Sequence, residues 1–188
     1  FVLASNGPHS MIITSNEIYK IKSDNVVKRR LKAVGMTFIL VGIFLFLILV
    51  PVCGDTIFGL LKETSKNQVF IDILYRIYQI IKYPLSILVV YFNIKLLYVV
   101  APDKKIRSKT TTKGALFTTI SWIIATEIYT FYIGSFSKYD LFYGNISNII
   151  ILLLWIYILS YIFVFGMAIN AGNTKEEDIE RTGMLLTK

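Results

Sequence analysis

The chain of 188 residues is 55% hydrophobic and 14% aromatic, with a mean hydropathy of +0.62, above the apolar share of an ordinary globular domain. Its net charge of +8 would suit nucleic acid, but the basic residues flank apolar runs, which favours a membrane surface. His9 and Cys53 are the only residues of their types, so no catalytic triad, metal-ligand cluster or intrachain disulfide is visible. We expect no enzyme activity, no catalytic residue, no metal, no cofactor and no nucleic-acid partner.

The first predicted element is a short, partial helix at residues 8–22, with Pro8 in its first turn, where a missing N–H costs nothing. Counting back from Lys20 at about 1.5 Å per residue places Gly7 and Pro8 about 20 Å away, near mid-bilayer for an upright helix. A helix broken at that depth points free N–H groups into a cavity and favours an anion, with His9 as a titratable donor. A kink needed only for packing is the alternative.

Four further runs are apolar and long enough to cross a hydrocarbon core of about 30 Å. The alternation with period two that marks a membrane strand is absent from them, so helices are expected. The sequence therefore predicts an all-α, polytopic transmembrane helix bundle. The predicted spans are residues 33–50, 84–101, 114–134 and 146–171, within a membrane domain of residues 1–172 followed by a charged tail, 173–188.

Between the first two of these spans, residues 69–82 carry apolar side chains at helical spacing, with Asp72 and Arg76 on the other face. This pattern predicts an amphipathic helix that lies at the outer interface and enters the membrane with a bend near Pro84. A single long helix that extends beyond the bilayer is the alternative.

Basic residues cluster before the span 33–50 and between the spans 84–101 and 114–134, whereas the remaining loops hold few. The positive-inside rule places both clusters and the C-terminal tail in the cytoplasm. Each basic residue near the surface also adds about 1 kcal/mol of attraction to anionic lipids, so headgroup contact is one interpretation and a plain topology signal is the other. The headgroup candidates are Lys28, Arg29, Arg30, Lys104, Lys105 and Arg107.

Polar side chains within the spans are the next candidates, because ionisable groups at membrane depth are costly and commonly face an internal cavity. The alternatives are a Glu127 buried against a hydroxyl or aromatic partner, and a Lys95 that snorkels to the headgroups. The substrate-binding candidates are Gly7, Pro8, His9, Asn93, Lys95, Thr126 and Glu127.

Short motifs occur along the chain in a characteristic order: Asn16-x-x-Tyr19, Pro102 with basic followers, Gly114-Ala115, Tyr139 with Tyr143, Trp155 with Tyr157, and Gly166 with Asn170. In this order and spacing the chain resembles the YihY/BrkB family of bacterial inner-membrane proteins, parts of which were labelled ribonuclease BN. The resemblance implies a bundle of about six transmembrane helices with both termini inside, and hence an N-terminal part that this chain lacks. It also links the chain to envelope integrity and virulence, and implies no established biochemical activity.

Together these features predict a multi-pass protein of the bacterial inner membrane with a cytoplasmic C-terminus. It would bind or transport an anionic envelope molecule, such as a lipid or a lipid-linked precursor. The expected partners are membrane lipids, that substrate and an envelope protein. A non-transporting scaffold for envelope integrity is the alternative, and a ribonuclease is a remote one.

Overall fold

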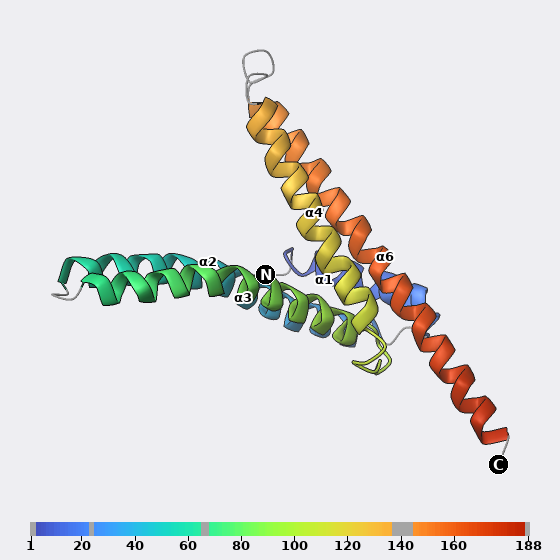
Figure 1. Ribbon diagram of the computed structural model, residues 1–188. Coiled ribbons are helices and arrows are strands. Elements are labelled where there is room, and N and C mark those ends of the chain that lie inside the picture. The colour runs from blue at the N-terminus through green and yellow to red at the C-terminus, as the bar shows by residue number, and fades with distance from the viewer. Residues whose placement is uncertain (1–2, 23–24, 65–67, 137–144, 187–188) are drawn as a thin grey trace. The chain divides into compact units, whose positions relative to one another are not determined.

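A computed structural model describes residues 3–22, 25–64, 68–136 and 145–186, and over those ranges the chain forms helices and loops without a strand. The all-α prediction is confirmed. Tyr139 and Tyr143 of the predicted outer loop lie outside the described residues. The helices are α1 (Asn6–Tyr19), α2 (Val26–Thr64), α3 (Gln68–Val100), α4 (Thr112–Phe136) and α6 (Asn145–Leu186) (Figure 1).

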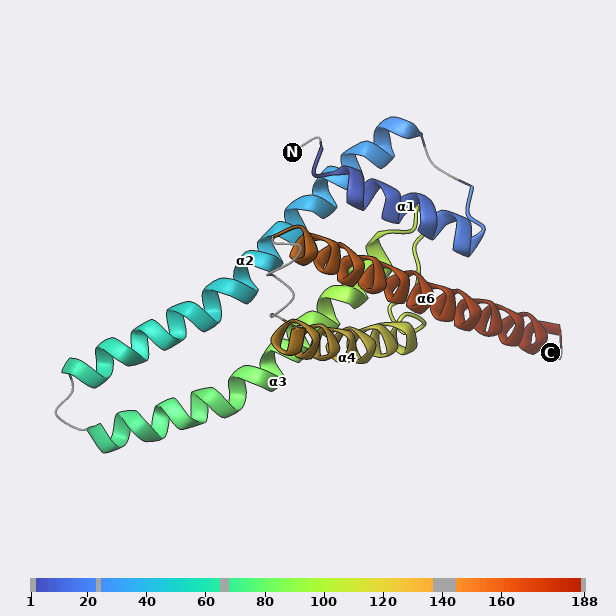
Figure 2. The same ribbon diagram turned by 90° about the horizontal axis from the view of Figure 1, so that it is seen from above.

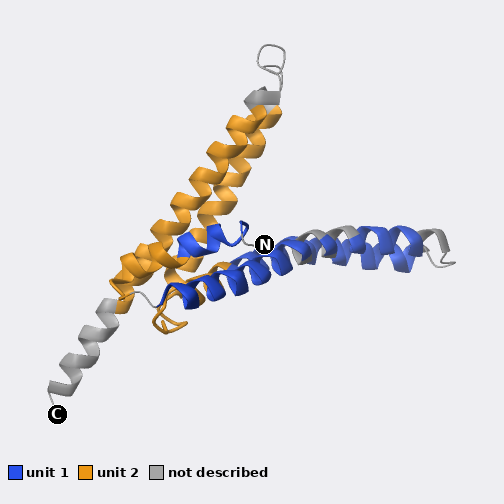
Figure 3. Ribbon diagram, turned by 180° about the vertical axis from the view of Figure 1, so that it is seen from behind, with its two compact units in different colours: residues 1–11, 24–93 blue, residues 12–23, 94–188 orange. Residues whose placement is uncertain are grey.

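The chain divides into two compact units, coloured separately in Figure 3. The first unit comprises residues 1–11 and 24–93, which hold the start of α1, all of α2 and most of α3. The second comprises residues 12–23 and 94–188, which hold the end of α1, the end of α3, and α4 and α6.

In the first unit, α1 begins at Asn6, directly before Gly7 and Pro8. The His9 amide donates to the Ser5 carbonyl oxygen at 3.0 Å, so Ser5 is the N-cap and Pro8 lies in the first turn, as predicted. Arg30, near the start of α2, donates from Nη1 to Asn6 Oδ1 at 2.9 Å. This contact favours a position for the start of α1 near the basic end of α2 rather than at mid-bilayer depth.

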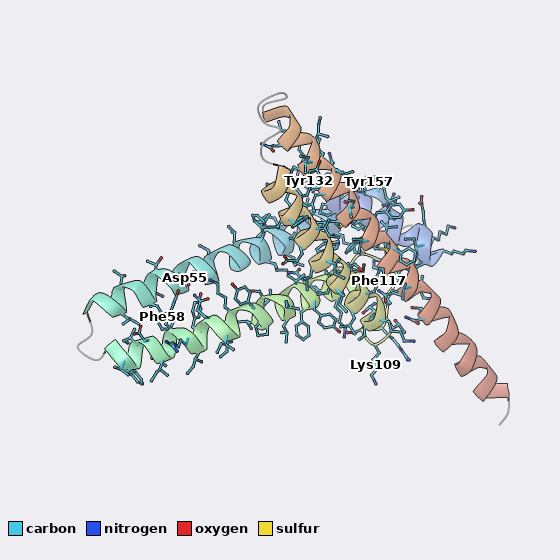
Figure 4. The ribbon with its side chains drawn as sticks, turned by 45° about the horizontal axis from the view of Figure 1, so that its top comes forward. Asp55, Phe58, Lys109, Phe117, Tyr132 and Tyr157 are labelled. Atoms are coloured by element: carbon cyan, nitrogen blue, oxygen red, sulfur yellow. The ribbon has the colours of Figure 1, made fainter. Side chains whose placement is uncertain are left out.

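The later part of α2 contacts α3 through aromatic rings and an ion pair. The Phe58 ring centroid lies 5.5 Å from that of Tyr75 and 5.1 Å from that of Tyr78. Lys82 Nζ lies 2.9 Å from Asp55 Oδ2 and 5.6 Å from the centroid of the Tyr78 ring. Figure 4 shows Asp55 and Phe58 on the side of α2 that faces α3.

Helix α3 is continuous across Pro84, which lies within its 33 residues. The backbone is therefore that of one long helix, the alternative to an interfacial helix that bends into the membrane. Neighbouring groups in a membrane protein can compensate the hydrogen bond that a proline removes, which makes such a helix tolerable. The interfacial position of residues 69–82 stays a prediction.

Among the described residues, three helical segments are long and apolar enough to cross a membrane: Val69–Val100, Thr112–Gly134 and Asn148–Thr174. They include the predicted spans 84–101, 114–134 and 146–171 to within a few residues, and the first extends further toward the N-terminus. Many of their large apolar side chains are exposed, with Phe131 at 73% and Ile128 at 63%, as expected where lipid is the solvent.

The remaining predicted span, 33–50, lies in α2, which is helical throughout that range, although several of its side chains are outside the described residues. At the other end of the chain, α6 does not stop near Gly172 but continues to Leu186. The Lys, Glu and Arg residues that follow Gly172 are good helix formers, so the charged tail extends the helix.

In the second unit, α4 and α6 lie side by side (Figures 1 and 2). They approach most closely at two glycines. A Cβ built on Gly114 would overlap the Gly166 carbonyl oxygen and the Asn170 amide, and one built on Gly166 would overlap the hydroxyls of Thr118 and Tyr98. The close helix contact at Gly166 therefore depends on the absence of a side chain there.

Polar bonds hold the same helices together. The Tyr98 hydroxyl donates to the Phe163 carbonyl oxygen at 2.7 Å, so its 2.6 Å bond with Thr118 Oγ1 uses the threonine proton. Further along α4, Trp122 Nε1 donates to the Leu159 carbonyl oxygen at 2.9 Å. These bonds connect α4 and the end of α3 to α6. They therefore fix the two helix ends that the loop between α3 and α4 joins.

Candidate anion-binding site

A cavity of about 630 Å³ lies in the second unit, between the end of α1, the loop that joins α3 to α4, and α6. Ile21, Ile106 and Ala171 give it apolar walls, and Thr110 and Thr174 add hydroxyl groups. Its charged lining is cationic except for one carboxylate. The charged residues that line it are Lys20, Lys22, Asp103, Lys104, Lys105 and Arg107.

The end of α1 shapes one side of this cavity. The Lys20 amide donates to the Glu17 carbonyl oxygen at 3.1 Å, and the Ile21 amide donates to the Asn16 carbonyl oxygen at 2.8 Å. This is the hydrogen-bond pattern of a Schellman motif, in which the chain reverses after the last helical turn. Lys20 has the left-handed conformation that the motif requires, with a φ of 54°.

A pair of side-chain hydrogen bonds joins this end of α1 to the opposite wall. Asn16 Nδ2 donates to Asp103 Oδ2 at 2.6 Å, and the Asp103 backbone amide donates to Asn16 Oδ1 at 2.9 Å. Asn16 is only 2% exposed, so little water competes for these bonds. The pair fixes the start of the basic loop relative to the end of α1.

Tyr19 lines the cavity, but its hydroxyl oxygen is buried and has no hydrogen-bond partner among the described residues. Burial raises the pKa of Tyr19 to about 12, because the charged phenolate is poorly solvated there. The hydroxyl therefore keeps its proton in the folded protein well above neutral pH.

Of the predicted headgroup residues, the structure brings together those of the loop between α3 and α4. Lys104, Lys105 and Arg107 all line the cavity. Lys28, Arg29 and Arg30 lie in the first turns of α2, in the other compact unit, and are not part of the lining.

The predicted substrate-binding residues lie elsewhere. Gly7, Pro8 and His9 are in the first turn of α1, Asn93 and Lys95 are on α3, and Thr126 and Glu127 are on α4. None of these side chains lines the cavity. Their role in binding stays a prediction.

Glu127 is exposed on the surface of α4, so the alternative in which it is buried against a hydroxyl or aromatic partner is wrong. Thr126, its neighbour, is exposed as well. Within the described ranges, His, Cys, Asp and Glu side chains form no group of three that could hold a metal ion.

Several residues of the cavity were not identified as site residues from the sequence. Lys20 and Lys22 are visible there only as part of a basic cluster, and Tyr19 and Asn16 only as an Asn-x-x-Tyr motif. That motif was the available signal, since its asparagine binds Asp103 and its tyrosine lines the cavity.

Comparisons with known proteins place these features in a family. The family described as Virulence factor BrkB matches residues 1–184 of the chain. A protein of Bacillus subtilis (strain 168) named as the ribonuclease-like protein YfkH is 31% identical over 169 residues, which is 89% of this chain and 60% of that protein. A UPF0761 membrane protein of Haemophilus influenzae (strain PittEE) is 34% identical over 76 residues, which is 40% of this chain and 28% of the relative.

The chain thus spans 60% of the length of YfkH and a smaller share of the UPF0761 relative. No solved structure matches it. The family match covers the end of α1, the basic loop and α6, which together form the cavity. The chain belongs to the Virulence factor BrkB family and is a membrane protein.

Proposed function

We propose that this membrane protein binds an anionic envelope molecule, a lipid or a lipid-linked precursor, through the headgroup that enters the basic cavity. The observation that supports this most directly is the lining itself, in which lysine and arginine residues from two chain segments surround one cavity. Cations that face one another across a cavity repel, and an anion between them relieves that repulsion.

The surroundings of the cavity suit a lipid headgroup better than a soluble anion. The cavity lies beside Thr174, at the end of the apolar segment Asn148–Thr174, where the helix leaves the hydrocarbon region that its composition predicts. Its apolar walls would contact the first carbons of a lipid, while its cations bind the phosphate. On the positive-inside rule this end of the bundle is cytoplasmic, in the bacterial inner membrane.

Native mass spectrometry of the protein in lipid nanodiscs tests the proposal. Nanodiscs of phosphatidylcholine with a minor share of phosphatidylglycerol should yield protein that retains phosphatidylglycerol selectively. The variant Lys104→Ala/Lys105→Ala/Arg107→Ala should lose most of that selectivity, because each basic residue contributes about 1 kcal/mol of attraction. Retention of bulk lipid only, by the unchanged protein, would refute headgroup binding.

A matched control removes the same kind of charge outside the cavity. Lys109 and Lys113 are exposed, lie in the same loop and the first turn of α4, and do not line the cavity. Figure 4 shows the Lys109 side chain pointing away from the helices. Lys109→Ala/Lys113→Ala should keep its lipid selectivity if the cavity, rather than the overall positive charge, binds the headgroup.

Transport requires more than binding, and a substitution at Glu127 distinguishes the two functions. A carboxylate exposed on α4 within a predicted span is costly unless it acts in a polar pathway. Glu127→Gln should then slow the movement of a fluorescent phosphatidylglycerol across liposome membranes and leave its retention in nanodiscs unchanged. Equal flipping by both proteins would leave binding as the function.

A scaffold is the second candidate, because α3 exposes Ile73 and Ile77 on one face, at 52% and 47%. An envelope protein bound to that face should co-purify with the chain and be lost from Ile73→Glu/Ile77→Glu.

Ribonuclease activity remains the remote alternative. It would appear as RNA cleavage that co-elutes with the pure protein and that every cavity variant retains.

A further inference from the structure

Lys20 has a backbone conformation that a lysine rarely adopts. Its φ of 54° lies in the left-handed region, and it is the non-glycine residue with positive φ in the described part of the chain. Glycine, or less often asparagine, is the usual residue at this position of a Schellman motif, because a Cβ there crowds the following carbonyl oxygen. A lysine at this site costs stability that a glycine would not.

The left-handed turn has a geometric consequence for the cavity. Four successive residues, Tyr19 to Lys22, line it. Successive side chains of a helix point in directions about 100° apart, and those of a strand alternate between faces, so neither structure directs four in a row to one cavity. The reversal at Lys20 does so, and it adds the basic residues Lys20 and Lys22 to the lining.

The lining holds more basic residues than acidic ones, and Lys20 and Lys22 contribute to that excess. The charged side chains on the other wall include Lys104, Lys105 and Arg107, and the one carboxylate, Asp103, already accepts a bond from Asn16. Phosphate oxygens accept several hydrogen bonds at once and carry the opposite charge, so a phosphate group fits this set of donors.

We infer that the turn at Lys20 is a phosphate-binding device, in which the Lys20 ammonium donates to a phosphate group that the basic loop on the opposite wall also binds. This inference rests on the proposed function and identifies Lys20 as a specificity-determining residue of the same cavity. A strained backbone at a binding site is a recurring way to present a side chain that a relaxed turn would not present.

Three variants of Lys20 separate charge from strain. Lys20→Gly removes both, Lys20→Ala removes the charge but keeps the Cβ, and Lys20→Arg keeps both. Gly and Ala should each weaken binding to nanodiscs that contain phosphatidic acid by about tenfold, the size of one charge-assisted hydrogen bond. Arg should bind within about twofold of the unchanged protein, because its charge and donors remain. In melting experiments without ligand, Gly should be more stable than Ala, since only Gly relieves the left-handed strain.

Lys109→Ala is the control, because it loses one positive charge of the neighbouring loop outside the cavity. It should bind phosphatidic acid as the unchanged protein does. If Lys20→Gly and Lys20→Ala bind with unchanged affinity, Lys20 merely ends α1 and the inference is wrong, while headgroup binding by the basic loop still stands. If the unchanged protein itself shows no preference for anionic nanodiscs, the proposed function fails instead.

The phosphate group can belong to a lipid or to free phosphate, and competition identifies the source. Inorganic phosphate should be titrated against phosphatidic acid nanodiscs. Displacement of the lipid by inorganic phosphate assigns the site to the phosphate group alone, and persistence of the lipid assigns it to the intact headgroup with its acyl chains. In both cases Lys20→Gly must weaken the binding that is observed.

Discussion

Asn16 and Asp103 are joined by two hydrogen bonds, one of 2.6 Å from the Asn16 side-chain amide to the carboxylate and one of 2.9 Å from the Asp103 backbone amide to Asn16 Oδ1. The two residues are 87 positions apart in the chain. The Asn16 side-chain amide has one donor nitrogen, which bonds the Asp103 carboxylate, and one acceptor oxygen, which bonds the Asp103 backbone N–H. The pair therefore positions the basic loop against the end of α1, and the cavity depends on it.

Replacement of Asn16 by alanine removes both bonds at once. Asn16→Ala should lower the free energy of unfolding by about 1–3 kcal/mol, because one bond involves a charged carboxylate and the site is nearly dry. It should also weaken headgroup binding, since the loop is no longer fixed. Thermal unfolding in detergent and lipid retention in nanodiscs measure the two effects. Ser10→Ala, an exposed position on the same helix, is the control and should change neither.

The Tyr19 hydroxyl tests the effect of a buried, unpaired group beside the cavity. Tyr19→Phe should leave phosphate-lipid binding unchanged, because a ligand in the cavity cannot reach a buried hydroxyl. Without ligand the variant should be as stable as the unchanged protein or more so, because the lost hydroxyl is buried and unpaired among the described residues. A variant that loses stability would contradict the absence of a hydrogen-bond partner for the Tyr19 hydroxyl.

The pH dependence of stability follows from the same residue. Because the pKa of Tyr19 is raised from 10.0 to about 12 in the folded protein, the folded state holds its proton where the unfolded state has released it. The free energy of unfolding contributed by Tyr19 is therefore complete below pH 10 and falls as the pH rises to about 12. Melting temperatures measured across this range should fall less steeply for Tyr19→Phe than for the unchanged protein.

Two glycines control the contact between α4 and α6. Gly166→Ala and Gly114→Ala should each destabilise the protein by about 1–3 kcal/mol or more, because the new methyl group would overlap backbone or hydroxyl atoms. Gly134 is on α4 as well, and a Cβ there meets nothing within 4 Å. Gly134→Ala should change stability by less than about 1 kcal/mol, in the stabilising direction. Equal melting temperatures for all three variants would contradict the close helix contact.

The ion pair between Asp55 and Lys82 is expected to hold α2 against α3. Lys82→Met leaves the Asp55 carboxylate without its partner and should lower the melting temperature slightly, because the pair is exposed. The reversed pair, Asp55→Lys/Lys82→Asp, should recover part of the loss, whereas either half of the reversal alone should not. Arg76→Met removes a charge from an exposed position of the same helix and serves as the reference.

Much of the fold follows from the sequence because apolar length alone identifies a membrane helix. The runs that predicted the spans 114–134 and 146–171 reappear in α4 and α6, since lipid-facing positions need no tertiary context to be recognised. Continuity at Pro84 was less predictable. Proline breaks helices in water, and its tolerance in α3 depends on surroundings that the sequence does not display.

The site was predictable in its charge but not in its geometry. The basic residues at positions 104, 105 and 107 were identified from their place beside a span, and they line the cavity. The pairing of Asn16 with Asp103 and the left-handed backbone at Lys20 depend on tertiary structure, since neither asparagine nor lysine signals them locally. The depth given for Gly7 and Pro8 assumed an upright helix, and the Asn6 contact with Arg30 favours a different placement.

The first turn of α4 is completed by a residue from another helix. Thr111 occupies the N-cap, but its hydroxyl donates to the Ser108 carbonyl oxygen, and the Gly114 amide instead donates to Asn170 Oδ1 at 2.8 Å. Asn170 follows 56 positions later. During synthesis on the ribosome, the Gly114 amide therefore lacks this partner until the part of α6 that holds Asn170 has been translated and inserted beside α4.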